Sequence, residues 1–198
     1  MNDLRSMILD MAYPILKKVG KVHMPYSRKL ITGDDYYRLK ERMISGHILV
    51  SFTRGELTNV LIPGGWSHIA MYVGKDRVIE AVGKGVVETS LVDFVMTKDY
   101  VACVSPTFCT PWKMIEAAEL AETQIGKPYD YGFDWQIGNQ EAFYCAEFPY
   151  WCYSKVVPKA EMGFRLKEVM GGLTIVPDDY MLAKKYFIVD YLSKAKVV

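Results

Sequence analysis

Three kinds of side chain in this sequence could together attack a carbonyl group: a thiol, an imidazole and a carboxylate. The chain has 4 cysteines and 3 histidines, so few combinations exist. A thiol becomes a nucleophile when a neighbouring imidazole takes its proton and a third polar group orients the imidazole ring. The segments around Cys145, His68 and Glu80 fit this requirement best.

His68 lies at the start of a predicted strand that leaves a loop containing Gly64 and Gly65. A strand end beside a loop is a rigid place from which to present a side chain to a cleft. Trp66 and Ser67 directly precede His68 and are candidate substrate-binding residues. The alternative is a half-buried strand histidine that is bonded to a carbonyl group and has no chemical role.

Glu80 lies in a second predicted strand, where apolar residues flank it. A buried acid needs a partner, and His68 is a suitable one. The two side chains share a face only if even-numbered residues pair with even-numbered ones. That register requires an odd number of residues in the connecting loop, such as three with a bulge, and a tight two-residue turn at Lys75 and Asp76 would put Glu80 on the wrong side. The alternative is a glutamate on an exposed face of the sheet.

Cys145 is predicted near the N-terminus of a helix over residues 144–155, after a loop-forming stretch. The positive end of a helix dipole lowers the pKa of a thiol and supplies free N–H groups for an oxyanion. Pro149 cannot donate a hydrogen bond to the Cys145 carbonyl, so we expect a distorted first turn that interrupts the helix. Cys152, two turns further along, is expected to be an inert core residue. The alternative is that Cys145 is also a core residue, because free cysteine is often buried.

The spacing of the cysteines predicts neither a disulfide nor a metal site. Cys145 and Cys152 would be separated by about 10.5 Å along one helix, beyond the roughly 7 Å limit for bridged Cα atoms. The cysteines and histidines form none of the close pairs typical of zinc sites. We therefore expect reduced thiols, no metal and no other cofactor. The remaining residues of these two types are Cys103, Cys109, His23 and His47.

Composition and charge are those of an ordinary folded domain. Hydrophobic residues make up 51% and charged residues 24%, and the net charge is +1. This balance predicts no nucleic-acid partner. Acidic residues interrupt the apolar N-terminus, so it does not resemble a secretory signal, and no stretch approaches the ~18 apolar residues of a membrane span. The expected location is cytoplasmic, with the cell envelope as the alternative, and no integral membrane segment is expected.

Hydrophobic periodicity and turn residues place these side chains on a mixed set of elements. Helices are expected over residues 3–22, 34–43, 111–126, 144–155 and 177–185. Strands are expected over residues 48–53, 67–73, 77–82, 86–89 and 99–104. The pattern indicates a single α+β domain with a meandering antiparallel sheet, and 198 residues suffice for one core.

The order of these motifs resembles the permuted branch of the NlpC-type cysteine peptidases, also described as YiiX/YebB-like hydrolases. The unpermuted family has its cysteine helix before its histidine strand, whereas here His68 and Glu80 come first. Residues 86–94 and 100–106 are also similar to later strands of the family. The motifs that carry the resemblance read Ser-His-Ile-Ala-Met-Tyr-Val-Gly from Ser67, Ile-Glu-Ala from Ile79, Gly-Lys-Pro-Tyr-Asp-Tyr-Gly from Gly126, and Tyr-Cys-Ala-Glu-Phe from Tyr144.

This resemblance implies a circularly permuted papain-like (NlpC-type) fold, in which helices pack on a central antiparallel sheet or partial barrel. Residues 46–155 would form the core. Residues 1–45 would be an N-terminal helical extension and residues 156–198 a C-terminal extension.

The resemblance also implies a cysteine hydrolase that cleaves a peptide or N-acyl amide bond through a thioester. Cys145 would attack, His68 would shuttle the proton and Glu80 would orient the imidazole ring. Tyr129 is similar in position to a tyrosine that lies near the thiol in the family, so it is a candidate substrate-binding residue. His47 stands where the family usually has a structural aspartate, and we do not assign it to the active site.

The implied substrates are a peptide, a peptidoglycan fragment or an acylated small molecule. Two alternatives stay open at this stage. One is a lipid acyltransferase or acyl hydrolase, as in the lecithin–retinol acyltransferase relatives of this fold. The other is a binding module that keeps the fold and has no turnover.

Overall fold

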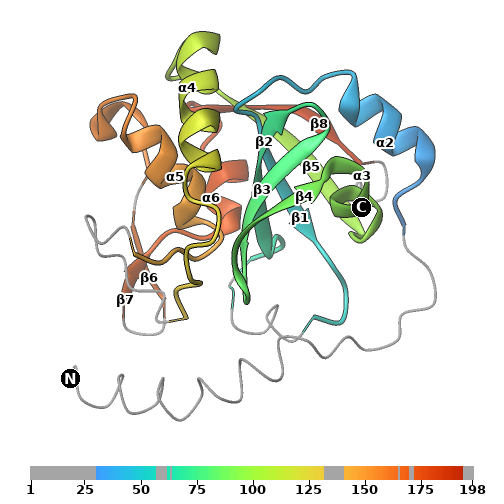
Figure 1. The fold of residues 1–198 in the computed structure, drawn as a ribbon, viewed down its shortest axis with the longest axis horizontal. Helices are drawn as coiled ribbons and strands as arrows, with labels where there is room; N and C mark the ends of the chain where they lie inside the picture. Colours follow the sequence, from blue (N-terminus) through green and yellow to red (C-terminus); the bar gives the residue numbers. More distant parts are fainter. Residues whose placement is uncertain are drawn as a thin grey trace.

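One antiparallel sheet of six strands occupies the centre of the molecule (Figure 1). The structure is a computed structural model that describes residues 30–193, apart from residues 57–61, 63, 132–140, 165 and 170–171. The strand order is β4-β3-β2-β1-β5-β8, and the sheet is open, with edges at β4 and β8. These strands are β1 (Ile48–Phe52), β2 (His68–Gly74), β3 (Arg77–Val82), β4 (Gly85–Ser90), β5 (Tyr100–Pro106) and β8 (Phe187–Leu192).

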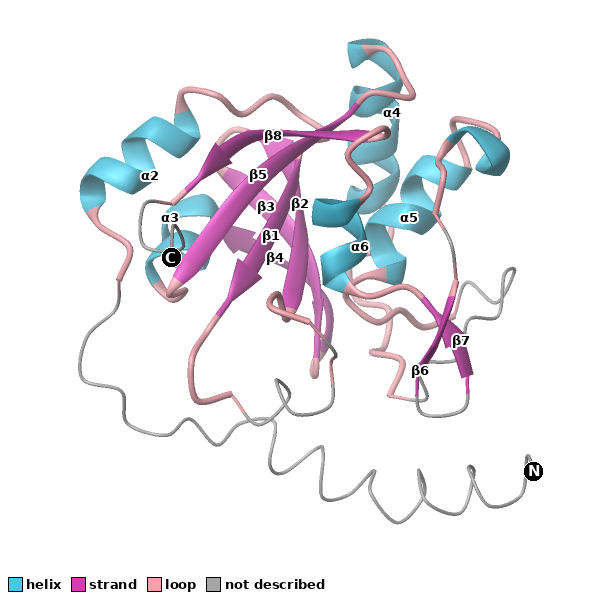
Figure 2. Ribbon diagram, turned by 180° about the vertical axis from the view of Figure 1, so that it is seen from behind, coloured by secondary structure: helices cyan, strands magenta, loops and turns pink. Residues whose placement is uncertain are grey.

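Helices cover both faces of this sheet, and a separate two-stranded hairpin lies beside it (Figures 1 and 2). One face packs against α4 (Pro111–Glu122), α5 (Glu147–Ser154) and α6 (Pro177–Leu182), and the other faces α2 (Gly33–Lys40) and α3 (Leu91–Met96). The hairpin is formed by β6 (Lys167–Val169) and β7 (Gly172–Thr174), and a short 3-10 helix spans Lys159–Glu161. The α+β fold class and the antiparallel meander are confirmed, and the sheet does not close into a barrel.

The two apolar clusters explain why the central strands read as nearly continuous hydrophobic runs. Successive side chains of a strand point to opposite faces. On β1, Ile48 and Val50 pack into the cluster beneath α4 and α5, whereas Leu49 packs into the cluster beneath α2 and α3. All three side chains are fully buried. A strand covered on both sides therefore loses the polar alternation of a half-exposed strand.

Side-chain caps define several helix starts. Thr32 and Asp35 form a capping box at the start of α2, in which the Thr32 N–H donates to the Asp35 carboxylate at 3.0 Å. Thr110 caps α4, and Pro111 occupies its first turn, where a missing N–H has no consequence. The helix α5 has no such side-chain cap among the described residues.

Several expected elements have different bounds in the structure. The helix expected over residues 144–155 begins only at Glu147, so Cys145 precedes it, and Pro149 lies in its first turn without interrupting it. A proline is tolerated there because first-turn N–H groups need no intrahelical acceptor. Residues 91–94, which resembled part of a strand, belong to α3, which Ser90 caps. The helix α4 ends at Glu122, before Gly126.

The remaining elements agree with the prediction, were not predicted, or lie outside the described residues. The strand expected over residues 77–82 is β3, and the helix expected over residues 177–185 is α6, three residues shorter. Sequence periodicity did not identify β8, whose six residues form an edge of the sheet. The helix expected over residues 3–22 lies outside the described residues.

The β2–β3 hairpin has the register that the candidate site requires. Ala70 pairs with Glu80, so even-numbered residues face even-numbered ones, as predicted. The turn itself is the tight two-residue type, with Lys75 and Asp76 at positive φ of 52° and 57°. A bulge between Tyr72 and Gly74 shifts the register by one residue and restores the required parity. The expectation of a longer loop was wrong, and the expectation of a bulge was right.

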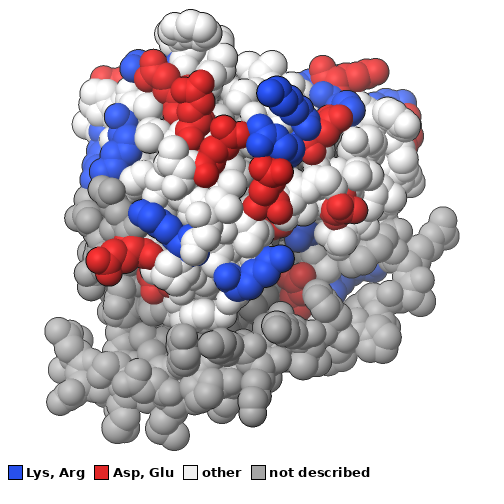
Figure 3. Space-filling view, in the orientation of Figure 1, with Lys and Arg blue, Asp and Glu red and all other residues white. Residues whose placement is uncertain are grey.

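The described surface is mixed in charge. On the face shown in Figure 3, acidic and basic side chains are interspersed. Among the described residues, Arg77 pairs with Glu88 at 2.9 Å and with Glu122 at 2.6 Å. Within the described part of the chain, no helix has the length and apolar character needed to cross a membrane.

We predict that Gly85→Ala destabilises the fold by about 2–4 kcal/mol, because Gly85 has φ of +111° and an added Cβ would lie 2.4 Å from the Lys127 carbonyl oxygen. Urea unfolding measures this free energy. The matched control is Gly33→Ala, where nothing lies within 4 Å of the added Cβ; its effect should stay within about 0.5 kcal/mol. Equal stability of the Gly85→Ala variant and the parent would contradict the close approach of residue 85 to the Lys127 carbonyl.

Candidate active site

His68 and Glu80 form the centre of the candidate site. His68 is the first residue of β2, and its Nε2 lies 2.6 Å from Glu80 Oε2 on β3. The other carboxylate oxygen, Oε1, accepts a 2.7 Å hydrogen bond from the Thr89 hydroxyl on β4. Both side chains are mostly buried, at 14% and 9% exposed. Three adjacent strands therefore hold the imidazole ring in one orientation.

Cys145 completes this arrangement on the other side of the ring. Its side chain is 3% exposed, and it forms a hydrogen bond with the His68 side chain. Cys145 directly precedes Ala146, the N-cap of α5. The Glu80 carboxylate is hydrogen-bonded to Nε2 of His68, so the Cys145 thiol contacts the ring from its Nδ1 side. The structure thus brings together the thiol, imidazole and carboxylate that the sequence singled out.

These contacts shift the pKa values of His68 and Glu80 in opposite directions. Burial lowers the pKa of His68, but hydrogen bonds with Cys145 and Glu80 outweigh this effect and raise it to about 9. Burial raises the pKa of Glu80, but the hydrogen bond and charge of His68 outweigh it and lower the pKa to about 2. The pair is consequently an imidazolium and a carboxylate at neutral pH.

Tyr129 lies directly beside the thiol. Residues 128–130 run next to Phe143, with hydrogen bonds from Asp130 N–H to the Phe143 carbonyl at 3.0 Å and from Phe143 N–H to the Pro128 carbonyl at 3.1 Å. The backbone of Cys145 forms a hydrogen bond with the Tyr129 hydroxyl. Burial raises the pKa of this phenol, so it remains protonated at neutral pH. The ring of Tyr131 packs edge-on against it, with centroids 4.9 Å apart.

The loop before His68 is held by α6. The Asp178 carboxylate accepts hydrogen bonds from the backbone N–H groups of Gly65 at 3.1 Å and Trp66 at 2.8 Å. Trp66 and Ser67 are buried, at 7% and 5% exposed. They lie beside His68 in the chain, and their role as substrate-binding residues stays a prediction.

Two neighbours of the His68–Glu80 pair were missed by sequence reasoning. Thr89 lies two residues from Val87, the partner of Glu80 on β4, so strand alternation puts it on the same face as Glu80 once the register is known. Lys98 lies close enough for its charge to lower the pKa of both His68 and Glu80. Its ammonium group sits 4.8 Å from the Phe94 ring centroid, and that ring is 6.1 Å from the His68 ring. No motif or spacing in the sequence predicts that Lys98 lies near this pair.

A second carboxyl group follows the thiol. Glu147 is 6% exposed, and burial, reinforced by the charge of Asp130, raises its pKa to about 8. This carboxyl is therefore mostly protonated at neutral pH, two residues from Cys145. The sequence shows an acid two residues after the cysteine, but it does not reveal that this acid is buried.

The other three cysteines differ from Cys145 in their surroundings. All four thiols are free, as expected. Burial raises the pKa of Cys103 and Cys152 well above the ordinary range for thiols, and it raises that of half-buried Cys109 to about 11. None of these three has a hydrogen bond to the ring of His68 among the described contacts.

Cys145, just before α5, lies against His68 and Glu80 on the sheet, and in the chain the thiol follows the imidazole and the carboxylate. The family model described as "Permuted papain-like amidase enzyme, YaeF/YiiX, C92 family" matches residues 42–181. The chain therefore belongs to this family, and a cysteine amide hydrolase is the activity that membership supports.

A solved structure has the same fold. The crystal structure of metalloprotein yiiX from Escherichia coli O157:H7 superposes with a TM-score of 0.56 and 18% sequence identity, covering 77% of this chain and 96% of that one. At this identity the likeness shows the fold alone. A search of curated proteins found no match.

We predict that Glu80→Gln lowers the pKa of His68 by about one unit or more, because an uncharged amide no longer favours the imidazolium. Titration of the His68 ring by nuclear magnetic resonance measures this, with the resonance assigned by its loss in His68→Gln. In the parent protein the midpoint should lie near pH 9. The control is Glu88→Gln, on the neighbouring strand and paired with Arg77, which should leave the midpoint unchanged. An unchanged midpoint in Glu80→Gln would mean that Glu80 does not set the charge of the ring.

Proposed function

We propose that this protein hydrolyses an amide bond through a thioester on Cys145, with His68 as proton carrier and Glu80 as the group that orients the ring. The observation that carries this proposal is the position of one imidazole between a thiol and a carboxylate. In that position the ring can exchange a proton with sulfur while its second nitrogen stays fixed.

The first half of the reaction forms the thioester. The Cys145 thiolate attacks the amide carbonyl carbon, a C–S bond forms, and the carbonyl electron pair moves to oxygen. As the C–N bond breaks, His68 gives its proton to the departing nitrogen and an amine leaves. In the second half, neutral His68 takes a proton from water, the hydroxide attacks the thioester, and the acid leaves as the thiol is regenerated.

The start of α5 is the proposed oxyanion site. In the first turn, Pro149 has no N–H and the Phe148 N–H donates to the Tyr144 carbonyl at 3.2 Å, which leaves the N–H of Glu147 without an intrahelical acceptor; no side chain in the described part of the chain caps this helix. The Glu147 N–H lies two residues from Cys145 in the chain, so it is the proposed donor to the negative oxygen that develops when the thiol attacks. The Tyr129 hydroxyl, bonded to the Cys145 backbone, borders the same position.

The proposed substrate is a peptide or another N-acylated amine, and peptide stems of cell-wall material are one member of this class. Membership of an amidase family supports an amide rather than an ester. Tyr129, against which the Tyr131 ring packs, supplies an aromatic side chain beside the thiol, which suits acyl and peptide groups alike.

One observation favours a second function, a binding module without turnover. The Cys145 side chain is 3% exposed, so a carbonyl group reaches the sulfur only after surrounding side chains move. The orientation of Glu80 toward His68 argues against this alternative, because a binding site has no need of a bonded thiol, imidazole and carboxylate. Reactivity of the thiol separates the two.

We predict that iodoacetamide at pH 7 modifies Cys145 before the other three cysteines, with peptide mass spectrometry as the measurement. Cys145→Ala should abolish the fast labelling and all release of amine from a panel of N-acyl and peptide amides. Cys109→Ser, which removes the most exposed of the other thiols, should keep both. Fast labelling without turnover of any amide or ester would favour the binding module. Preferential labelling of Cys109 would overturn the assignment of Cys145.

We also predict that the pH profile of kcat/KM declines on its alkaline side near pH 9. The leaving amine needs the His68 proton, and a raised pKa keeps that proton in place until the pH passes about 9. Removing the Glu80 charge lowers this pKa, so Glu80→Gln should shift the decline to lower pH. Glu88→Gln should not. A decline at the same pH in the Glu80→Gln variant would show that His68 is not the titrating group.

A further inference from the structure

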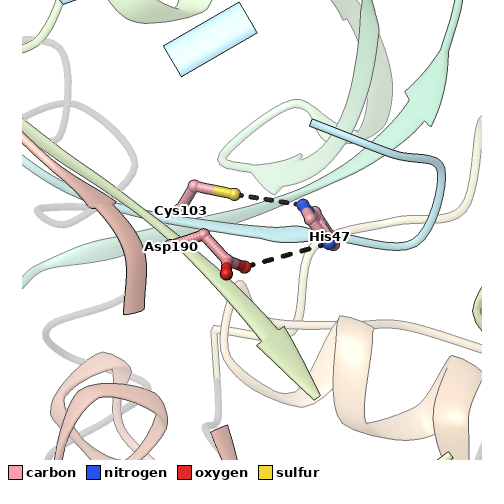
Figure 4. A group of neighbouring side chains, drawn as sticks. All are labelled: His47, Cys103 and Asp190. Carbon is pink, nitrogen blue, oxygen red and sulfur yellow. Dashed lines mark hydrogen bonds and ion pairs between the residues drawn. The ribbon is translucent and has the colours of Figure 1, made fainter. Parts of the chain in front are cut away.

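A second cluster of a thiol, an imidazole and a carboxylate lies away from the candidate active site (Figure 4). His47 directly precedes β1, Cys103 lies on β5, and Asp190 lies on β8. Their nearest donor atoms, one from each side chain, all lie within 4.8 Å of one another. His47 and Cys103 are buried, at 5% and 0% exposed. Sequence spacing gave no sign of this group, because the three residues are far apart in the chain.

The distances inside the cluster suit donors that share one metal ion. Cys103 Sγ lies 3.3 Å from His47 Nδ1. Tetrahedral zinc, with bonds of about 2.3 Å to sulfur and 2.0–2.1 Å to nitrogen, holds such donors about 3.5 Å apart. A thiol hydrogen bond to Nδ1 explains the same distance, so this pair alone does not identify a site. His47 Nδ1 also accepts a long hydrogen bond of 3.4 Å from the Ile44 N–H, which a metal ion would replace.

The carboxylate supplies the observation that points to a ligand. Asp190 Oδ2 is buried, and no hydrogen-bond donor among the described residues reaches it. Its distance of 3.9 Å to His47 Nε2 is too long for a hydrogen bond. A buried carboxylate oxygen without a partner is costly, and a metal ion would satisfy it.

We propose that His47, Cys103 and Asp190 bind one divalent transition-metal ion, for which zinc fits best. Nitrogen, sulfur and oxygen donors together are typical of zinc, whereas calcium and magnesium prefer oxygen alone. A thiolate and a carboxylate balance the two positive charges, so the buried site is neutral. Asp190 is on an edge strand with its side chain 29% exposed, which leaves it free to move the short distance toward the other two donors.

This site would join three strands and would take no part in amide hydrolysis. Cys103 is fully buried and has no hydrogen bond to the ring of His68 among the described contacts, so we assign it no role as a second nucleophile. The ion would connect β8 with β1 and β5, its nearest strands in the sheet order. Asp190 lies beyond residues 42–181, the part matched by the family model, so the ion would fix a C-terminal strand that the family core does not include.

The test is titration of the metal-free full-length protein with Co²⁺, which reports thiolate ligation through a near-ultraviolet sulfur-to-cobalt absorption band. The parent protein should bind about one equivalent and show this band, and Zn²⁺ should displace the cobalt. Cys103→Ala should lose the band, and Asp190→Asn should weaken binding tenfold or more. Cys145→Ala is the matched control, because it removes the other thiol that is bonded to a histidine, and it should bind as the parent does.

Any one of three results would overturn the proposal. These are a failure of the parent protein to bind Co²⁺ or Zn²⁺ saturably, persistence of the absorption band in Cys103→Ala, and loss of the band in Cys145→Ala. If Cys103→Ala does not fold, Asp190→Asn decides, because its side chain is partly exposed and its substitution leaves the core intact. Parent-like binding by Asp190→Asn would then count against the site. None of these results depends on amide hydrolysis.

Discussion

One extra residue in the β2–β3 hairpin decides on which side of the sheet Glu80 lies. The two-residue turn pairs Gly74 with Arg77, and continuing that register would set Glu80 opposite Met71, in the cluster beneath α4 and α5. The bulge shifts the pairing so that Glu80 faces Ala70 and its carboxylate meets His68. An unpaired carboxylate buried in the apolar cluster would cost several kcal/mol. The bulge therefore determines whether Glu80 has a partner at all.

The permuted chain order explains why the remaining contacts are long-range. The thiol arrives more than sixty residues after the imidazole, so backbone pairing must align the two segments. Val86 on β4 exchanges hydrogen bonds of 2.8 and 2.9 Å with Lys127 and Gly126, and residues 128–130 then pair with Phe143. From the other side, the Tyr180 hydroxyl donates to the Ala146 carbonyl at 2.7 Å. Cys145 is thus held between a loop fixed to the sheet edge and a helix from the C-terminal part.

Most of the sheet could be predicted from sequence, because β1, β2, β3 and β5 are runs of β-branched and aromatic residues between turn residues. The edge strand β8 could not, since Asp190 and Tyr191 interrupt its apolar residues and its pairing with β5 is non-local. The start of α5 was placed too early, because Tyr144 and Cys145 are apolar enough to extend the helical pattern, while their burial comes from tertiary contacts.

The candidate site likewise contains residues that could be predicted from the sequence and residues that could not. His68, Glu80 and Cys145 could be found because few histidines and cysteines exist and because an acid in an apolar strand needs a partner. Thr89 and Lys98 could not be predicted. Thr89 reaches Glu80 only through the register of β3 and β4, and Lys98 is brought near by the connection between α3 and β5. The cluster of His47, Cys103 and Asp190 was missed for the same reason: Cys103 and Asp190 lie on β5 and β8, His47 directly precedes β1, and these segments meet only in the assembled sheet.

The surroundings of His68 bear on both halves of the proposed reaction. Burial and the charge of Lys98 lower its pKa, whereas the thiol and Glu80 raise it. While the thiol is free, the raising contacts prevail and the ring holds a proton, which the proposed reaction would transfer to the leaving amine. In the proposed thioester, sulfur is bonded to the acyl group and its present hydrogen bond with the ring is lost, so one contact that raises the pKa of His68 is missing. The pKa must then fall, because burial and Lys98 still act on the ring. A lower pKa favours neutral imidazole, which is the form that can take a proton from water. The proposed thioester thus changes His68 from an acid into a base without any movement of Glu80.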